Sequence, residues 1–201
     1  MGLLGGSFNP AHEGHRHVAR SALRDLGLDQ VWLLVSPGNP LKRADGMATF
    51  ADRLQSARRI ADGRRIIATD IEQRLGTRYT ADTLRLLRRR FPNVRFVWLM
   101  GADNLVQFPR WNDWLSIARS VAFAVLPRRT YTARALAGQA AQRLRRARLP
   151  ASCAHGLAAR KPPAWMLLPT RLHAASATAI RARHTEADQP ECSAHRPQAT
   201  A

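Results

Sequence analysis

The sequence has few cysteines and no long apolar run, and both absences exclude large classes of protein. Its 201 residues include 2 cysteines, Cys153 and Cys192, which are too few for a disulfide framework and fit no short zinc-binding motif. A membrane helix needs a run of about 18 apolar residues, and none is present. The N-terminal residues reach glycines and histidines too early for a secretory signal. We therefore expect a soluble, cytoplasmic protein that does not enter a membrane.

Acidic residues are scarce compared with basic ones. The chain has 32 Lys+Arg against 14 Asp+Glu, which gives a formal net charge of +18. Such a charge attracts polyanions, so a nucleic-acid-binding module and an enzyme for nucleotide phosphates are both possible interpretations. Much of the arginine lies in helical stretches, at residues 84–90 and 143–148, which are also typical of solvated helix faces.

Short apolar runs alternate with helical patterns along the chain. Strands are predicted at residues 2–5, 31–36, 66–69, 95–101, 121–126 and 165–168. Three segments carry apolar side chains at three- and four-residue spacing and are predicted to form crossover helices: 14–26, 50–61 and 80–91. The alternation predicts an α/β fold with a single doubly wound, Rossmann-like parallel sheet.

The pattern also suggests where the domain ends. Residues 1–184 are interpreted as one domain, within which residues 149–163 form a connecting loop. Residues 185–201 are small, polar or proline and show no apolar periodicity, so they are predicted to be a disordered tail.

The segment GGSFNPAHEGH, residues 5–15, follows the first predicted strand and leads into a helix. Paired glycines let the backbone approach a ligand closely, and Pro10 fixes a turn. Free N–H groups and the helix dipole would suit phosphate oxygens here. The segment has neither the Walker pattern nor the dinucleotide-binding pattern of glycines.

Three histidines, His12, His15 and His17, lie at the start of this helix. His12 and His15 are three residues apart and share a face, where they could donate to a polyphosphate. Two other interpretations stay open at this point: a zinc site made by the three histidines, and a glycine turn with incidental histidines.

This segment resembles the GGxFxPxHxGH signature of the HxGH nucleotidyltransferase superfamily, whose members adenylylate small phosphorylated substrates. The resemblance implies that His12 and His15 are catalytic, because they contact the triphosphate of ATP and stabilise charge on the leaving pyrophosphate. It also implies that the loop binds ATP through Gly5, Gly6, Ser7 and Phe8.

A second segment, ASATAIR at residues 175–181, could open a final helix. Taken alone, a serine cap followed by an arginine fits an anion site or a plain helix cap equally well. The segment is similar to the ISxTxIR signature of the same superfamily, although Ala175 replaces the usual isoleucine. The resemblance implies ATP contacts, and a catalytic role for the arginine, at Ser176, Thr178, Ile180 and Arg181.

Two central segments are similar to those of the nicotinate mononucleotide adenylyltransferase branch. RYTADTL, residues 78–84, resembles YTxDTL, and this implies that the acceptor nucleotide is bound by Tyr79, Thr80 and Thr83. A capped helix start explains the same residues and is compatible with binding. GADNLVQFPRW, residues 101–111, resembles GxDxLxxFxxW. This implies that Asp103 contacts a ribose in the ATP site and that Trp111 stacks on the pyridine ring, although Trp111 could equally be a core residue.

A weaker match is the loop PGNPLK, residues 37–42. Relatives often carry a histidine before the lysine, where this chain has Leu41. Lys42 is expected to act as a catalytic residue that neutralises pyrophosphate, and the alternative is a solvated loop lysine.

Together the resemblances imply transfer of the adenylyl group of ATP to nicotinate mononucleotide, with release of pyrophosphate, in NAD biosynthesis. Mg²⁺ would be carried by the ATP phosphates, without a metal site in the protein. The expected partners are these small molecules, with no nucleic acid and no membrane, and the oligomeric state is left open. Alternative acceptors are nicotinamide mononucleotide and phosphopantetheine, and the hypothesis from another class is the basic nucleic-acid-binding module.

Overall fold

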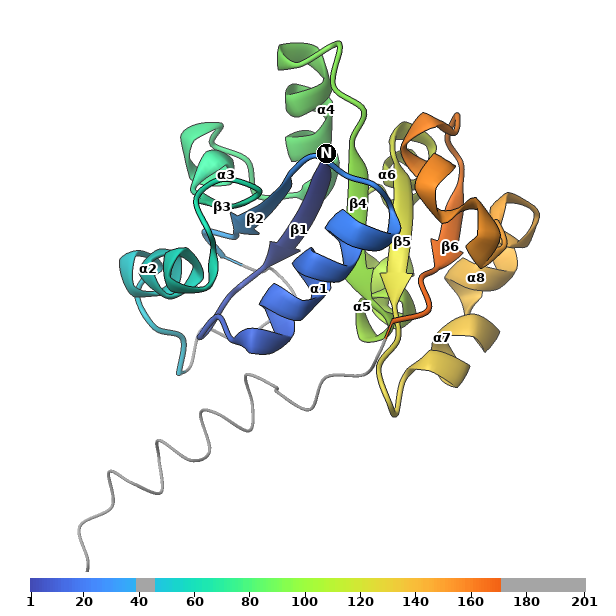
Figure 1. Ribbon diagram of the computed structural model, residues 1–201, viewed down its shortest axis with the longest axis horizontal. Helices are drawn as coiled ribbons and strands as arrows, with labels where there is room; N and C mark the ends of the chain where they lie inside the picture. Colours follow the sequence, from blue (N-terminus) through green and yellow to red (C-terminus); the bar gives the residue numbers. More distant parts are fainter. Residues whose placement is uncertain (39–45, 171–201) are drawn as a thin grey trace, which may run out of the picture.

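The computed structural model describes residues 1–38 and 46–170, which form a six-stranded sheet covered by helices (Figure 1). The strands are β1 (Gly2–Gly6), β2 (Val31–Val35), β3 (Ile66–Thr69), β4 (Val97–Gly101), β5 (Ala122–Leu126) and β6 (Trp165–Leu167). Their order across the sheet is β3-β2-β1-β4-β5-β6, and all neighbouring strands are parallel. The predicted α/β, doubly wound, Rossmann-like sheet is confirmed.

Successive strand residues build two apolar cores, one on each face of the sheet. Leu4 and Leu99 belong to one core, whereas their chain neighbours Leu3 and Trp98 belong to the other. Successive side chains of a strand point to opposite faces, so apolar strands such as VWLLV and AFAVL bury both faces. The continuous apolar runs are therefore the reason that helices cover the sheet on both sides.

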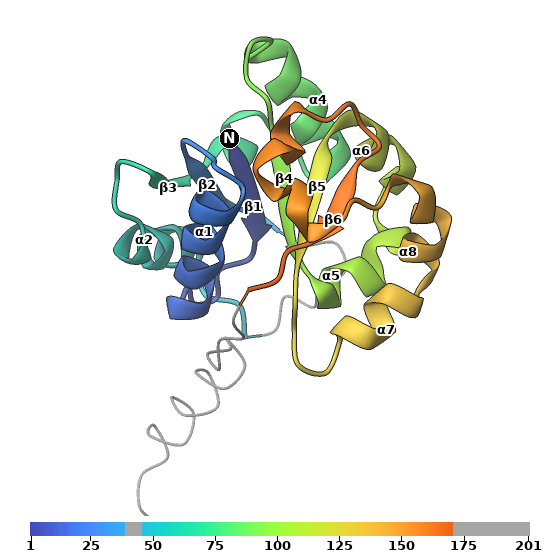
Figure 2. The ribbon, with the colours of Figure 1, turned by 45° about the vertical axis from the view of Figure 1, so that its right-hand side comes forward.

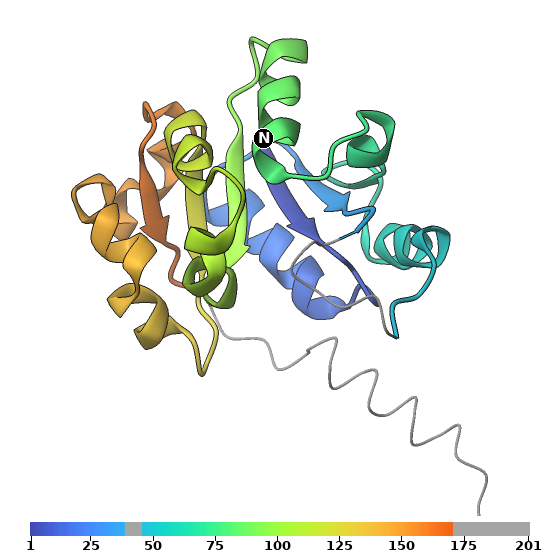
Figure 3. The same ribbon diagram turned by 180° about the vertical axis from the view of Figure 1, so that it is seen from behind.

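The helices divide between the two faces. The first core is covered by α1 (Glu13–Asp25), α2 (Phe50–Ile60) and the 3-10 helix η3 (Ala151–Ala159). The opposite face, seen in Figure 3, carries α4 (Thr80–Arg90), α5 (Ala102–Gln107), α6 (Trp114–Ser120), α7 (Thr132–Ala137) and α8 (Gln139–Arg143). Short helices in the connections are α3 (Ile71–Arg74), η1 (Phe108–Arg110) and η2 (Arg145–Ala147). No helix of the described residues is long and apolar enough to span a membrane.

The predicted elements lie within two residues of the observed ones, with one exception. The segment predicted as a connecting loop, 149–163, contains η3, which lies close to the edge strand β6 (Figure 2). Ala154 and Leu157 of η3 are buried against the sheet. They are three residues apart, and a 3-10 helix places residues at that spacing on one side. The prediction of a loop was wrong here, because a 3-10 helix repeats every three residues and does not show the 3.6-residue period by which an α-helix is recognised.

The order of the strands determines where a ligand can bind. From β1 the chain builds the sheet outward to β2 and β3, and it then returns to place β4 on the other side of β1. At such a switch point the two connections diverge and leave a crevice beyond the carboxyl ends of the strands. Gly6 ends β1 and Gly101 ends β4, so the first and fourth connections leave the sheet side by side at this crevice.

Candidate active site

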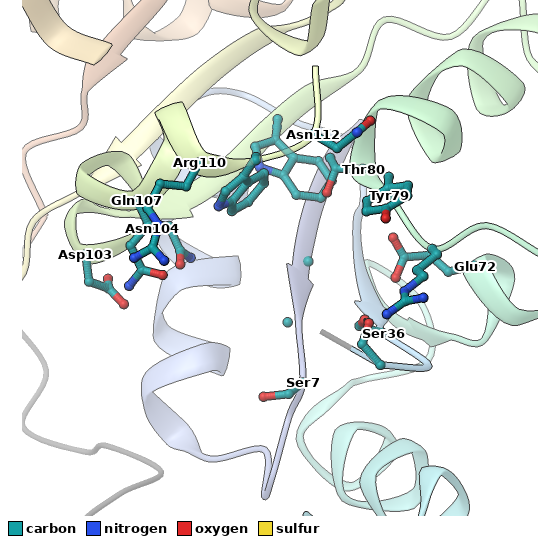
Figure 4. A pocket seen from close by; sticks show the side chains of 16 residues that line it. Ser7, Ser36, Glu72, Tyr79, Thr80, Asp103, Asn104, Gln107, Arg110 and Asn112 are labelled. Carbon is teal, nitrogen blue, oxygen red and sulfur yellow. The ribbon is translucent and has the colours of Figure 1, made fainter. Parts of the chain in front are cut away.

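A cavity of about 410 Å³ lies at the carboxyl ends of β1, β2 and β4 (Figure 4). The predicted site residues that line it are Gly5, Gly6, Ser7, Tyr79, Thr80, Asp103 and Trp111. The other lining residues, for which no role was predicted, are Ser36, Gly38, Glu72, Arg78, Trp98, Asn104, Gln107, Arg110 and Asn112. Segments from three distant parts of the chain therefore meet in one cavity.

Several predicted residues cannot be placed. Those outside the described residues are Lys42, Ser176, Thr178, Ile180 and Arg181. The roles assigned to them by resemblance stay predictions.

Gly5, near the end of β1, makes room for a side chain of the cavity wall. A Cβ atom on Gly5 would lie 2.6 Å from Cη2 of Trp98, so only glycine leaves room for that indole ring. The Trp98 ring meets Trp111 edge to face, with centroids 6.2 Å apart. Trp111 also packs edge-on against Phe108 and is half-buried, so it contacts the core and lines the cavity at once.

Two predicted residues lie behind the cavity wall. Phe8 is 1% exposed, and its ring packs against His15 with centroids 4.9 Å apart. Its φ of 49° lies in the left-handed region, which is unusual for a bulky residue and gives the sharp turn between β1 and α1. Only the backbone of Phe8 can face ATP. Thr83 is completely buried, and its hydroxyl contacts Thr77 rather than the cavity.

His12 and His15 lie together at the N-terminus of α1, with ring centroids 3.9 Å apart. His12 is the N-cap residue, and its Nδ1 accepts a hydrogen bond from the Gly14 N–H at 3.1 Å. Nδ1 of His15 accepts from the His12 N–H at 3.2 Å. Because both Nδ1 atoms accept, each ring carries its proton on Nε2. The backbone thus gives each histidine a defined N–H donor, which suits phosphate oxygens.

A zinc site was one interpretation of these histidines. In residues 1–38 and 46–170, no three His, Cys, Asp or Glu side chains are grouped as metal ligands. Instead, the two cap hydrogen bonds account for Nδ1 of His12 and of His15.

Arg53 on α2 connects the loops that follow β1 and β2. It is 3% exposed, and burial lowers the pKa of its guanidinium group. The guanidinium donates to the carbonyl oxygens of Ser7 at 2.8 Å, Ser36 at 2.7 Å, Pro37 at 3.2 Å and Ala48 at 3.1 Å. A buried positive charge therefore lies behind the predicted ATP loop and fixes the shape of that loop.

Glu72 on α3 is a buried carboxyl group at the other side of the cavity. It is 8% exposed, and its Oε1 accepts a hydrogen bond from Thr83 Oγ1 at 3.2 Å. Thr83 Oγ1 lies 2.8 Å from Thr77 Oγ1, which completes a buried cluster. Burial raises the pKa of Glu72 to about 7, and the hydrogen bond from Thr83 opposes this shift.

The raised pKa predicts how Glu72→Gln changes stability with pH. The pKa of Glu72 in the folded protein lies above its ordinary value of 4.5, so protonation of Glu72 favours the folded state. That contribution is complete below about pH 4.5 and is lost as the pH rises through 7. The free energy of unfolding should be measured with urea at about pH 5 and pH 8. Between these pH values, the difference between Glu72→Gln and the wild type should shift by roughly 2–3 kcal/mol in favour of the variant. Glu13→Gln, at an exposed glutamate, is the control, and equal pH profiles for wild type and Glu72→Gln would contradict the expectation.

Asp103 lines the cavity, and Arg128, which follows β5, lies beside it. Asp103 Oδ1 lies 3.6 Å from Arg128 Nε, and Asp103 lies in the first turn of α5. Gly101 ends β4 beside them, and a Cβ atom there would collide with the Asp103 carboxylate. The strand end thus leaves space for Asp103 to turn into the cavity, where a ribose hydroxyl could donate to it.

Comparison with known proteins adds to this geometry. A family model described as cytidylyltransferase-like matches residues 3–183. Proteins named "Probable nicotinate-nucleotide adenylyltransferase" from Gluconacetobacter diazotrophicus and Gluconobacter oxydans are each 59% identical to this chain. The matches cover 90% of this chain and 85% and 93% of those proteins, respectively.

A solved structure shows the same fold. It is titled Plasmodium falciparum nicotinic acid mononucleotide adenylyltransferase complexed with NaAD, and it superposes with a TM-score of 0.66 at 17% sequence identity. The superposition covers 90% of this chain and 82% of that chain.

Proposed function

Since this chain belongs to the cytidylyltransferase-like family, we propose that it transfers the adenylyl group of ATP to nicotinate mononucleotide. The products are nicotinate adenine dinucleotide and pyrophosphate, and the reaction is a step of NAD biosynthesis. The observation that carries this proposal is one cavity in which the loop after β1, the start of α4 and Trp111 meet. These elements match the ATP and acceptor segments of the family, and close relatives carry the name of this activity.

The reaction is an in-line displacement at phosphorus. An oxygen of the acceptor's 5′-phosphate forms a bond to the α-phosphorus of ATP, and the bond from that phosphorus to the bridging oxygen of pyrophosphate breaks. The attacking phosphate is already ionised near neutral pH, so no strong general base is needed. The protein contributes alignment and stabilisation of charge.

The described residues divide between the two substrates. Gly6 and Ser7 line the cavity, whereas His12 and His15 at the start of α1 are not among its lining residues. We place the triphosphate between this loop and the start of α1, where Nε2 of His12 and of His15 would donate to it. Asp103 takes a ribose hydroxyl in the ATP site. The pyridine ring of the acceptor stacks on Trp111, opposite Tyr79 and Thr80.

We extend the proposal to the residues that lie outside the described part of the chain. Lys42 and Arg181 would neutralise the leaving pyrophosphate, and Ser176, Thr178 and Ile180 would contact ATP. Mg²⁺ would arrive with ATP, bound by phosphate oxygens and water. We also propose that residues 1–184 act as one catalytic domain in the cytoplasm, where the free thiol of Cys153 stays reduced.

The identity of the products tests the proposed function. Protein incubated with ATP, Mg²⁺ and nicotinate mononucleotide should release pyrophosphate and a dinucleotide in equal amounts, as measured by mass spectrometry. Omitting Mg²⁺ should stop the reaction. Release of ADP or of inorganic phosphate without a dinucleotide would contradict adenylyl transfer.

Trp111→Ala should chiefly weaken binding of the acceptor. Loss of the ring removes stacking and buried area, so the KM for nicotinate mononucleotide should rise about tenfold while the KM for ATP changes by less than about twofold. Trp114→Ala is a matched control, because Trp114 packs on the same Phe108 without lining the cavity. A rise in the KM for ATP alone would show that Trp111 belongs to the ATP site.

A further inference from the structure

The cavity contains a buried carboxyl group to which the reaction as described assigns no role. We propose that Glu72 determines specificity for the acceptor: protonated, it favours a ring that carries a carboxylate, and ionised, it favours a ring that carries an amide. The inference rests on the proposed function, because it concerns the acceptor end of the same cavity.

The position of Glu72 brings it close to the acceptor. Figure 4 shows its carboxyl group on the cavity side, between Tyr79 and Ser36. The backbone carbonyl of Glu72 accepts from the Thr77 N–H at 3.0 Å, so the turn that leads from α3 into α4 is fixed to it. Oε1 of Glu72 is bound to Thr83 in the first turn of α4. Hydrogen bonds of both its backbone and its side chain therefore hold Glu72 next to the start of α4.

In the proposed pose, the substituent of the acceptor ring lies at this same place. A pyridine ring stacked on Trp111 would lie in the cavity that Tyr79 and Thr80 also line. Tyr79 is the N-cap residue of α4, and it makes no side-chain hydrogen bond to the helix start. The Asp82 and Thr83 N–H groups donate to the carbonyl oxygen of Tyr79 at 3.1 Å, so the N–H groups of Thr80 and Ala81 are those that a ligand can take, and a carboxylate suits them. A carboxylate bound there lies within about one helical turn of Glu72.

The hydrogen-bond partners of Glu72 explain why its charge is poorly compensated. Thr83 Oγ1 has a single proton, and besides Glu72 it reaches the carbonyl oxygen of Tyr79 at 3.3 Å and Thr77 Oγ1 at 2.8 Å. An ionised Glu72 therefore shares this one neutral donor with the carbonyl oxygen of Tyr79, while either threonine hydroxyl can donate to the other. A protonated Glu72 becomes a donor itself, and its pKa of about 7 allows both states near neutral pH.

The charged groups around Glu72 do not replace it in this role. On α3, Asp70 and Arg74 pair with each other at 2.6 Å, and on α4, Asp82 and Arg85 pair with each other. The other charged side chains that line the cavity are Arg78, Asp103 and Arg110. Within the described residues none of these cations forms an ion pair with Glu72, so its charge changes the field at the acceptor directly.

The two states of Glu72 have opposite effects on the two acceptors. The protonated, neutral carboxyl group does not repel an acceptor carboxylate at this separation, whereas the ionised group repels the carboxylate and attracts the positive end of an amide N–H dipole. If binding of the acid requires the protonated state, its affinity falls by up to about tenfold per pH unit above the titration midpoint. The preference for nicotinate over nicotinamide mononucleotide should therefore decline as the pH rises.

The test compares kcat/KM for these two acceptors with saturating MgATP between about pH 6 and 8.5. Both acceptors carry the same 5′-phosphate, so the titration of the phosphate cancels in the ratio. The wild-type ratio of acid to amide should fall by about tenfold or more over this range, and the ratio for Glu72→Gln should stay constant. Asp29→Asn, at an exposed position outside the cavity, should keep the wild-type profile.

Two outcomes of this comparison would overturn the inference. One is an acid-to-amide ratio that stays constant with pH in the wild type, and the other is a ratio that falls equally with pH in Glu72→Gln. If Glu72→Gln does not fold, Thr83→Val decides instead: loss of the hydroxyl donor should move the midpoint of the wild-type profile to higher pH, and an unchanged midpoint contradicts the proposal. Turnover of neither acceptor by the wild type would overturn the proposed function itself, whereas turnover with a flat ratio overturns only the role of Glu72.

Discussion

His15→Ala should lower kcat by about a hundred- to a thousandfold while the protein stays folded. The ring donates from Nε2 because its Nδ1 accepts the His12 N–H, so the substitution removes a donor that the backbone has already oriented. A donor of this kind acts on the charge that develops as pyrophosphate leaves, and its loss should therefore appear in kcat more than in the KM for ATP. Steady-state kinetics and a thermal melt of the same sample measure both expectations.

The matched control for this variant is His17→Ala. His17 lies on the same helix, two residues further on, outside the capping arrangement of His12 and His15. Its substitution should leave kcat within about twofold, since His17 is not among the groups assigned to the substrates. If His17→Ala were as inactive as His15→Ala, the three histidines would act as one set, and the metal interpretation would replace the phosphate-donor interpretation.

Arg53→Met should lower the free energy of unfolding by about 3–5 kcal/mol, because four carbonyl oxygens lose their buried donor. Two of these oxygens belong to Ser7 and Ser36, which line the cavity, so the loops after β1 and β2 should also lose their fixed shape. We therefore expect the KM for ATP to rise in this variant by about tenfold or more at a temperature where it remains folded.

Arg58→Met provides the comparison on the same helix, because Arg58 is exposed. It should change stability by less than about 0.5 kcal/mol. Arg53→Lys separates charge from hydrogen bonding: lysine keeps the positive charge but cannot serve four carbonyl oxygens from a planar group. Chemical denaturation of the three variants gives the stabilities. An Arg53→Met protein as stable as Arg58→Met would show that the four hydrogen bonds do not fix the loops.

The sequence predicts the sheet well because its strands are short, continuous apolar runs that both faces must bury. It also predicts the part of the site that consists of local motifs, since a glycine turn before a helix or a start such as Tyr79-Thr80 is encoded within a few residues. The helices α5 to α8 were not predicted, because each has only 5–7 residues and shows less than two turns of periodicity.

Residues whose role depends on distant contacts were missed for different reasons. The burial of Arg53 could have been predicted, because this residue occupies the apolar face of α2 together with Leu54 and Ala57, where a charge is unusual. The burial of Glu72 could not, because an acidic residue shortly before a glycine turn is typical of exposed surface. Only the packing of α3 against β2 and the cluster of threonine hydroxyls bury it. The Nδ1 hydrogen bonds of the histidines likewise require the turn at Phe8, which composition does not reveal.

The central claim is adenylyl transfer from ATP to nicotinate mononucleotide, and a comparison of acceptors tests it most directly. Pyrophosphate release would be measured with ATP and Mg²⁺ and one acceptor at a time: nicotinate mononucleotide, nicotinamide mononucleotide or phosphopantetheine. We predict that kcat/KM near pH 7 is highest for nicotinate mononucleotide and that phosphopantetheine, which has no ring to stack on Trp111, is a poor acceptor. A preference for phosphopantetheine, or no pyrophosphate with any of the three, would contradict the account.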